Sequence, residues 1–159
     1  MNIYPHDTVV PFKNSSESKK KQVENMFDKI AFRYDFLNRF LSAGTDVGWR
    51  KKAIRELIPL QPKKLLDVAT GTGDFAITSF KMLKPETITG IDISEGMLEI
   101  GRKKIIKAGL QHHIKLIQGD SEAISFEDDS FDAVTVAFGV RNFENLEKGL
   151  ADIFRGLKP

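Results

Sequence analysis

The sequence predicts an α/β fold in which helices cover both faces of a parallel β-sheet. From residue 63 onward, short apolar runs alternate with segments whose apolar residues have helical spacing. The first apolar run, residues 64–69, leads through Gly71 and Gly73 into a helix expected at residues 74–83. This alternation is typical of parallel strands joined by right-handed crossovers. The two glycines permit a tight turn that a ligand can approach closely.

The remaining elements of the sheet domain follow from the same patterns. Three more strands are expected, at residues 87–91, 114–118 and 131–138. Ser94 is suited to cap a helix that runs to about residue 107, and Gly109 is suited to end it. A last helix is expected over residues 144–157.

The chain is expected to divide into an arm, a helical cap and the sheet domain. Residues 1–15 hold two prolines and show no periodicity, so we expect an extended arm. Residues 16–62 show helical spacing and are expected to form the cap. Residues 63–159 hold the sheet domain.

Two helices are expected within the cap. Apolar residues recur every three or four positions between Val23 and Leu41, and a break near residues 32–35 is an open alternative. The second helix is expected to start at Asp46 and to end before Pro59.

The composition excludes several classes of protein. A chain of 159 residues with 41% hydrophobic content suits one globular domain. It has no apolar run of about 18 residues and no apolar signal core, so we expect a cytoplasmic protein. The absence of cysteine excludes thiolate chemistry, and with three histidines no metal site is expected. The net charge of +2 argues against nucleic acid, and Lys19–Lys21 and Lys103–Lys104 are expected to be solvated helix faces.

Two classes of ligand fit the glycine turn. Gly71-x-Gly73-x-x-Ala76 satisfies the dinucleotide fingerprint, with Asp92 near the position of a ribose-binding acid. Asp67 argues against a diphosphate, because its negative charge would repel one. S-Adenosylmethionine carries an ammonium and a sulfonium group and no phosphate, so a nearby carboxylate favours it. An alternative role for Asp67 is a hydrogen bond to its own glycine loop, and the two roles are compatible.

Polar residues follow the carboxyl ends of all four strands, where ligands of such sheets bind. They lie at residues 70–74, at Asp92, at Asp120 with Ser121, and at residues 139–142. Asp92 is suited to accept both hydroxyls of a ribose, or else to bond the start of the next helix. Asp120 with Ser121 is suited to bind an adenine amino group, and a plain turn is the equal alternative.

The loop after the fourth strand is a candidate acceptor site. Arg141 and Asn142 lie on it and are suited to orient an oxygen of an acceptor. The alternative for Arg141 is an ion pair with a surface acid. His112 and His113 precede the third strand, so we expect them at the opposite edge of the sheet.

Three separated motifs carry a family resemblance: Tyr34-Asp35-x-x-Asn38-x-x-Leu41-Ser42 followed by Trp49, the stretch Asp67–Asp74, and Phe138-Gly139-x-Arg141-Asn142. Together they resemble the UbiE/MenG family of S-adenosylmethionine-dependent C-methyltransferases of quinone biosynthesis, over about residues 15–159. The resemblance implies a Rossmann-like class I methyltransferase fold. It also implies a cofactor site formed by Asp67, Gly71, Thr72, Gly73, Asp92, Asp120 and Ser121.

The same resemblance implies a reaction, namely methyl transfer to a ring carbon of a prenylated demethylmenaquinol or, in some members, of a ubiquinol precursor. A phenol-like pKa of about 10 means that the acceptor hydroxyl needs help to lose its proton. Arg141 is expected to stabilise the oxyanion and Asn142 to orient it, with Asp35, a water or no protein group as base. The prenyl tail implies transient contact with a membrane surface. The apolar face of residues 23–41 either lines that opening or only covers the sheet.

The chain departs from the family pattern in residues and in length. Family members commonly have Met in place of Leu37, His in place of Asp46, and Asn-Ala in place of Asp120-Ser121. They also commonly have Ser in place of Ala137 and Val in place of Gly156. The loss of a histidine at Asp46 removes a candidate proton acceptor. The match stops before the family's fifth strand, so we expect a sheet of order 3-2-1-4, truncated after strand four and its helix.

The exposed edge of strand four is expected to promote a homodimer. Two other interpretations of the chain stay open. One is a cofactor-binding fragment without catalytic activity, and the other is an NAD-dependent oxidoreductase.

Overall fold

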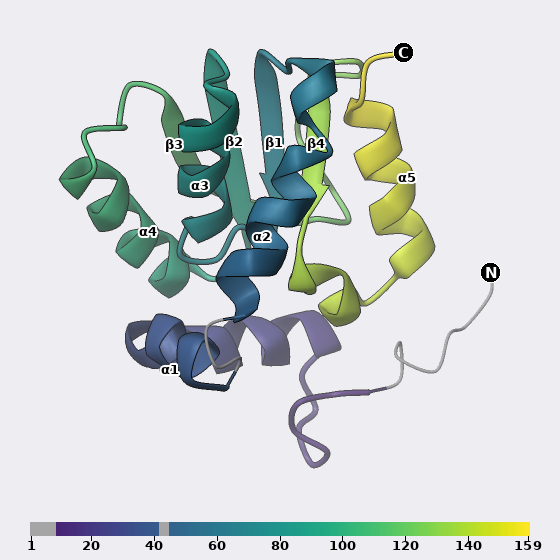
Figure 1. Cartoon of the computed structure of the whole chain (residues 1–159). Coiled ribbons are helices and arrows are strands. Elements are labelled where there is room, and N and C mark those ends of the chain that lie inside the picture. The colour runs from purple at the N-terminus through teal and green to yellow at the C-terminus, as the bar shows by residue number, and fades with distance from the viewer. Residues whose placement is uncertain (1–8, 42–44) are drawn as a thin grey trace.

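The computed structural model describes residues 9–41 and 45–159, with side chains for residues 9–35 and 45–159. Residues 1–8 of the expected arm therefore lie outside the described part. The elements follow in chain order (Figure 1): α1 Lys19–Leu41, α2 Thr45–Arg55, the 3₁₀ turn η2 Ile58–Leu60, β1 Lys64–Val68, α3 Asp74–Leu83, β2 Thr87–Asp92, α4 Glu95–Lys107, β3 Ile114–Gln118, β4 Ala133–Val136, the 3₁₀ turn η3 Phe138–Asn142, and α5 Leu146–Gly156.

Four parallel strands form one sheet in the order β3-β2-β1-β4, which confirms the predicted α/β fold and strand order. Successive side chains of β1 point to opposite faces. Leu65 packs into a core with α3 and α4, whereas Leu66 and Val68 pack into a second core that includes Ile153 of α5. Each face of the sheet thus has its own apolar core and its own helical cover.

Side-chain caps set where two of the helices begin. The Ser94 hydroxyl accepts a hydrogen bond from the Met97 amide at 3.2 Å, which confirms Ser94 as the cap of α4. Gly109 has a φ of 70° directly after that helix, as a C-terminal stop requires. Asn145 accepts from the Lys148 amide at 3.0 Å and caps α5. The last helix therefore begins at Leu146, later than the sequence predicted.

Two other elements differ from the prediction. α1 runs from Lys19 to Leu41 without the break considered near residues 32–35, and no glycine or proline interrupts it. The fourth strand is shorter than the predicted 131–138. Phe131 forms an isolated parallel bridge with Leu157, and Phe138 already belongs to η3.

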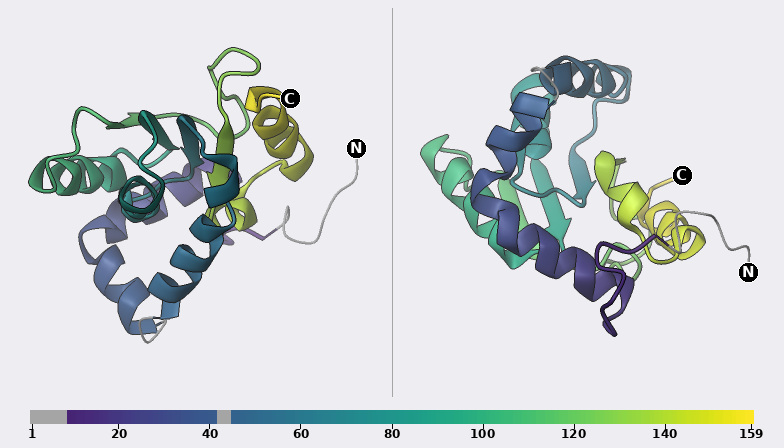
Figure 2. Two further views of the ribbon diagram at one scale, coloured as in Figure 1. Left: turned by 45° about the horizontal axis from the view of Figure 1, so that its top comes forward. Right: turned by 90° about the horizontal axis from the view of Figure 1, so that it is seen from below.

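The helix α1 lies across the end of the sheet where the strands finish (Figures 1 and 2). Its Asp28 carboxylate accepts hydrogen bonds from the Ser94 hydroxyl at 2.6 Å and from the Gly96 amide at 3.1 Å. An acid at the N-terminus of α4 also complements the dipole of that helix. α1 is therefore fixed to the core as a roof over the carboxyl ends of the strands.

Candidate functional site

A cavity of about 570 Å³ lies at the carboxyl ends of the strands, bordered by residues of α1 and α2. Its size is in the range typical of small-molecule and cofactor sites. The cavity brings together all the predicted site residues except Gly73, namely Asp67, Gly71, Thr72, Asp92, Asp120, Ser121, Arg141 and Asn142. His112 and His113 do not line it.

The two glycines of the turn have different surroundings. Gly71 has a φ of 58° and lines the cavity. Gly73 has a φ of 75° at the start of α3 and faces the core, where an added Cβ would lie 3.3 Å from Leu116 Cδ1. Both positions need the left-handed backbone that glycine adopts most easily. Gly73 therefore shapes the turn without facing the cavity.

Asp67 is a buried acid at the end of β1, with a side chain that also reaches its own loop. It is 1% exposed and accepts hydrogen bonds from the Thr70 hydroxyl at 2.6 Å and the Thr135 hydroxyl at 2.7 Å. Burial raises the pKa of Asp67 to about 6, against the lowering effect of these two hydroxyls. The bond to Thr70 is the loop contact considered from the sequence, and Asp67 lines the cavity as well.

Asp92 ties the second strand to two backbone amides. Its carboxylate accepts from the Gly71 amide at 2.8 Å and from the Ser94 amide at 2.9 Å. Burial raises the pKa of Asp92 above its ordinary value, although the bonds from Ser94 and Gly71 lower it. Asp92 thus both supports the start of α4 and lines the cavity.

Asp120 is paired with a lysine of α1. Lys20 Nζ lies 2.7 Å from Asp120 Oδ2, and the Glu122 amide donates to Oδ1 at 2.9 Å. Partial burial lowers the pKa of Lys20, but its bond to Asp120 and the acid's charge raise it overall. Lys19 is 6% exposed and donates to the Phe143 carbonyl at 2.9 Å. The prediction that these lysines form a solvated face is therefore wrong for Lys19 and Lys20, because both turn toward the sheet.

The other half of α1 contacts the glycine turn. Asp35 accepts from the Thr72 hydroxyl at 2.5 Å and from Lys104 Nζ at 2.8 Å. Lys104 also donates to Thr72 at 3.0 Å and pairs with Asp74. The prediction of a solvated Lys104 is therefore wrong. Asp35, the candidate base, borders the cavity with both carboxylate oxygens engaged.

Arg141 and Asn142 border the cavity on η3, which follows β4. The Arg141 guanidinium lies 5.9 Å from the centre of the Phe138 ring. Among the described residues, no ion pair includes Arg141, which leaves its surface-acid alternative without support. Phe138 and Trp49, 53% and 65% exposed, add apolar surface to the lining.

The charges of the lining suit a cationic ligand better than a diphosphate. Arg50, a cation of the lining, is already shared between Asp46 at 3.2 Å and Asp74 at 3.5 Å. Burial has raised the pKa of two of the acids, so a positive ligand charge would stabilise their ionised form. A diphosphate in the cavity would instead meet more acids than bases, because the described lining has three basic residues, Lys20, Arg50 and Arg141, and seven acidic ones, namely Asp35, Asp46, Asp67, Asp74, Asp92, Asp120 and Glu122. The residues present therefore fit S-adenosylmethionine.

The sequence indicated that the apolar face of residues 23–41 either lines the site or covers the sheet, and that Asp35 is a candidate base, but it did not indicate that Lys20 reaches the cavity. Lys20, Phe27 and Tyr34 of α1 line it together with Asp35. The signal was present, because these residues fall on the helical face that also carries Val23. A lysine and an aspartate on an otherwise apolar face indicate that both find partners in the core.

Neither a membrane span nor a metal site is found in the described residues. None of their helices combines the length and apolar character of a bilayer-spanning segment. No group of three or more histidine, aspartate or glutamate side chains among them is placed to hold a metal ion.

Solved structures with this fold define its class. A SAM-dependent methyltransferase of Thermotoga maritima is 25% identical, with a TM-score of 0.64 over 84% of this chain and 56% of that chain. A SAM-dependent methyltransferase of Aquifex aeolicus is also 25% identical, with a TM-score of 0.61 over 69% of this chain and 58% of that chain. The fold is the Rossmann-like α/β fold of class I S-adenosylmethionine-dependent methyltransferases, as the sequence predicted.

The chain belongs to the ubiE/COQ5 methyltransferase family, whose sequence pattern matches residues 15–159. Demethylmenaquinone methyltransferase of Bacteroides fragilis is 52% identical over 98% of this chain and 63% of the relative. The enzyme of that name from Porphyromonas gingivalis is 46% identical over 98% of this chain and 61% of the relative. A ubiquinone/menaquinone biosynthesis C-methyltransferase UbiE of Geobacter sulfurreducens is 44% identical over 89% of this chain and 56% of the relative. The chain thus spans less than two thirds of the length of these relatives.

Proposed function

We propose that this chain binds S-adenosylmethionine and takes part in methyl transfer to a ring carbon of a prenylated demethylmenaquinol, with a ubiquinol precursor as a second acceptor. The names of its relatives support a role in menaquinone or ubiquinone biosynthesis. The observation that carries the proposal is the cavity itself, whose lining includes both Asp67 and Arg141. An acid for a cationic donor and a cation for an anionic acceptor thus border one space.

The protein's main contribution is to align the two reactants and exclude water. Bound S-adenosylmethionine supplies an electrophilic methyl group on a sulfonium. Asp67 and Asp92 hold positive charge and ribose hydroxyls at the ends of β1 and β2. Gly71 lines the cavity and has no side chain, so a bound cofactor would be able to approach its backbone closely.

On the acceptor side, Arg141 and Asn142 act on the quinol oxygen. A ring carbon becomes nucleophilic when the neighbouring hydroxyl loses its proton, and the ring later loses the hydrogen that the methyl group replaces. The Arg141 guanidinium stabilises the developing oxyanion, because it carries a fixed positive charge at the cavity. Asn142 orients the same oxygen. Asp35 is the candidate proton acceptor, provided that its bonds to Thr72 and Lys104 open.

The prenyl tail supports a transient contact with a membrane surface. Trp49 and Phe138 expose apolar surface at the cavity, where a tail has to leave the site. Amphipathic contact of this kind is reversible and needs no inserted helix.

The alternatives make different predictions for ligand binding. A calorimetric titration with S-adenosylhomocysteine and with NADH separates them. Binding of S-adenosylhomocysteine alone supports the proposal, binding of NADH alone supports an oxidoreductase, and binding of neither contradicts both. A methyl-transfer assay with labelled S-adenosylmethionine and a short-chain demethylmenaquinol then separates an active chain from a cofactor-binding fragment without activity.

A further inference from the structure

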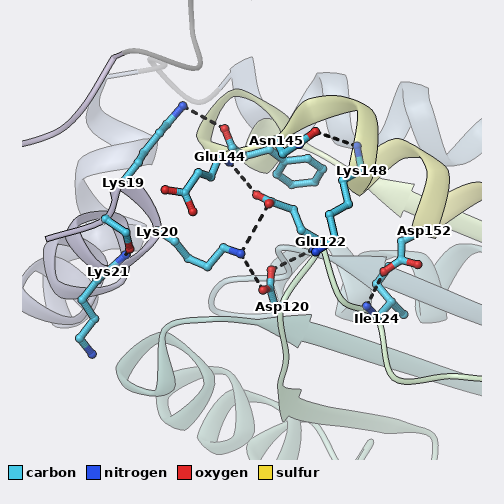
Figure 3. Close-up of polar contacts among 12 residues, drawn as sticks. Lys19, Lys20, Lys21, Asp120, Glu122, Ile124, Glu144, Asn145, Lys148 and Asp152 are labelled. Atoms are coloured by element: carbon cyan, nitrogen blue, oxygen red, sulfur yellow. Dashed lines mark hydrogen bonds and ion pairs between the residues drawn. The ribbon is translucent and has the colours of Figure 1, made fainter. Parts of the chain in front are cut away.

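Glu122 is a buried acid that the proposed mechanism does not use. It is 4% exposed and lies in the loop after β3, two residues beyond Asp120. Its Oε1 accepts a hydrogen bond from the Glu144 amide at 2.6 Å, and its own amide donates to Asp120 at 2.9 Å (Figure 3). Glu122 therefore contacts both Asp120 and the chain that follows η3.

The chain directly after Arg141 and Asn142 is held at two successive backbone groups. The Phe143 carbonyl accepts from Lys19 Nζ at 2.9 Å, and the Glu144 amide donates to Glu122. The Phe143 ring is 3% exposed and anchors the same point in the core. The loop that carries Arg141 and Asn142 thus ends at a fixed position, where Figure 3 shows Glu144 beside Lys19 of α1.

The contact from Glu122 acts together with the Lys19 bond and the buried Phe143 ring to hold the end of η3. η3 is a five-residue 3₁₀ turn without a side-chain cap. A bond from a backbone amide to a carboxylate is among the stronger neutral-to-charged contacts, and its loss leaves the Glu144 amide without this acceptor. Lys20 pairs with both acids, since its Nζ lies 2.7 Å from Asp120 Oδ2 and 3.5 Å from Glu122 Oε2. It therefore holds the two acids close to each other.

We propose that Glu122 is a positioning residue that fixes the Arg141–Asn142 segment relative to Asp120. Glu122 thereby sets the distance between the cofactor side and the acceptor side of the site. The expected effect of Glu122 on the reaction rate rests on the proposed function. Its role in holding the segment in place does not depend on that function. The function is to hold a loop, so an oxygen acceptor at this position is required and a negative charge is not.

The structural part is tested by amide hydrogen exchange in the intact chain. In Glu122→Ala the Glu144 amide should exchange at least about tenfold faster, which corresponds to about 1.4 kcal/mol. Glu122→Gln keeps an acceptor oxygen and should restore slow exchange. Glu127→Ala, at an exposed glutamate of the same loop, is the matched control and should have no effect. Unchanged exchange at Glu144 in Glu122→Ala would overturn the inference.

The catalytic part is tested by turnover. Glu122→Ala should lower kcat about tenfold while the affinity for S-adenosylhomocysteine stays unchanged, and Glu122→Gln should recover most of the rate. In an Arg141→Ala background, Glu122→Ala should have little further effect, because it acts through the same segment. If the two substitutions instead lowered kcat by independent factors that multiply in the double variant, general destabilisation would be the cause. That result would overturn the inference. If the wild-type chain transfers no methyl group, the proposed function fails, and the exchange experiment alone decides the role of Glu122.

Discussion

Asp67 combines burial with the negative charge that we propose for binding the cationic cofactor. Its two hydroxyl donors, Thr70 and Thr135, do not compensate fully for the loss of water, so the pKa of Asp67 is raised to about 6. A raised pKa in the folded state means that ionisation opposes folding. The protonated Asp67 carboxyl contributes its full stabilisation of the fold at pH values below 3.8, the ordinary pKa of an aspartate. This stabilisation is lost as the pH rises through about 6, the pKa of Asp67 in the folded protein. At neutral pH the ionised Asp67 carboxylate thus lowers the stability of the fold, and a bound cation would offset this loss.

The variant Asp67→Asn should remove this pH dependence. From pH 4 to pH 7 the free energy of unfolding of the variant should rise relative to that of the wild type by up to about 3 kcal/mol. The reason is that the wild type has to ionise a carboxyl whose pKa folding has raised by about two units, and the variant has no such group. Urea unfolding across this range measures the difference, with Glu127→Gln at an exposed acid as control. The same variant should bind S-adenosylhomocysteine more weakly. A constant difference from the wild type across the range would contradict the role of burial.

Arg141 is the cation of the acceptor side. Arg141→Ala should lower kcat on the order of a hundredfold at saturating acceptor, as expected for the loss of one oxyanion-stabilising group. The affinity for S-adenosylhomocysteine should not change, because the acids that we propose to hold the cofactor lie at the ends of other strands or just after them. Lys148→Ala, at an exposed residue of α5, serves as the control. An unchanged kcat at saturating acceptor would exclude Arg141 from the reaction.

At the scale of elements, α1 is as much a part of the site as the strands are. It contributes Lys20 to the acid after β3, Asp28 to the start of α4, and Asp35 to the glycine turn. These contacts lie at three points along one helix, so the helix is held across the whole rim. The roof of the cavity is therefore fixed by polar contacts to the same loops that carry the candidate ligand-binding residues.

The turn after β4 depends on a close approach between two residues. Ala69 has a left-handed φ of 53°, and a Cβ at Gly139 would lie 2.2 Å from the Ala69 Cβ. A glycine at position 139 is thus required by its neighbour Ala69, at the start of the chain's path from β4 into η3.

A double-mutant cycle tests this approach. Gly139→Ala should destabilise the fold by about 1–3 kcal/mol, as expected for overpacking. Ala69→Gly should be near neutral, since relief of the left-handed alanine offsets the added entropy of the unfolded chain. In the double variant most of the loss should disappear, because the other neighbours of the new Cβ lie at 3.6 Å or more. Thermal or urea unfolding gives the coupling energy, and additive effects would contradict the steric explanation.

For the whole molecule, the sequence predicts what depends on local pattern and misses what depends on long-range contacts. The strand–helix alternation, the Ser94 cap and the Gly109 stop are local, and all three were predicted correctly. The partners of Lys20 and Lys104 lie 100 and 69 residues away in sequence, so no local rule identifies them. The close approach of Gly139 to Ala69 is also long-range, because the two residues meet only after the sheet has formed.

The candidate site divides along the same line. Residues placed by the rule that ligands bind at the carboxyl ends of parallel strands do gather at one cavity. Glu122 was not predicted, because its partner is a backbone amide that the sequence does not mark. Positioning residues of this kind are visible only when the loops are folded against one another.

The sheet leaves β4 at an edge, next to an apolar stripe on α5. β4 pairs with β1 on one side, and Figure 1 shows α5 beside it. On α5, Leu150 and Phe154 lie four residues apart and are 46% and 79% exposed. An unpaired edge beside exposed apolar side chains promotes pairing with a second copy. We therefore expect the chain to self-associate as its concentration rises.

Size-exclusion chromatography with light scattering measures this association over a concentration series. Leu150→Glu and Phe154→Glu should shift the equilibrium toward the monomer, because each puts a charge into the contact between copies. Ile106→Glu is the matched control, since Ile106 is 65% exposed but lies on α4. This helix connects β2 and β3, which are at the other end of the sheet from β4. If α4 and α5 variants behaved alike, general surface hydrophobicity would be the cause. A monomer at every concentration would contradict the edge as an interface.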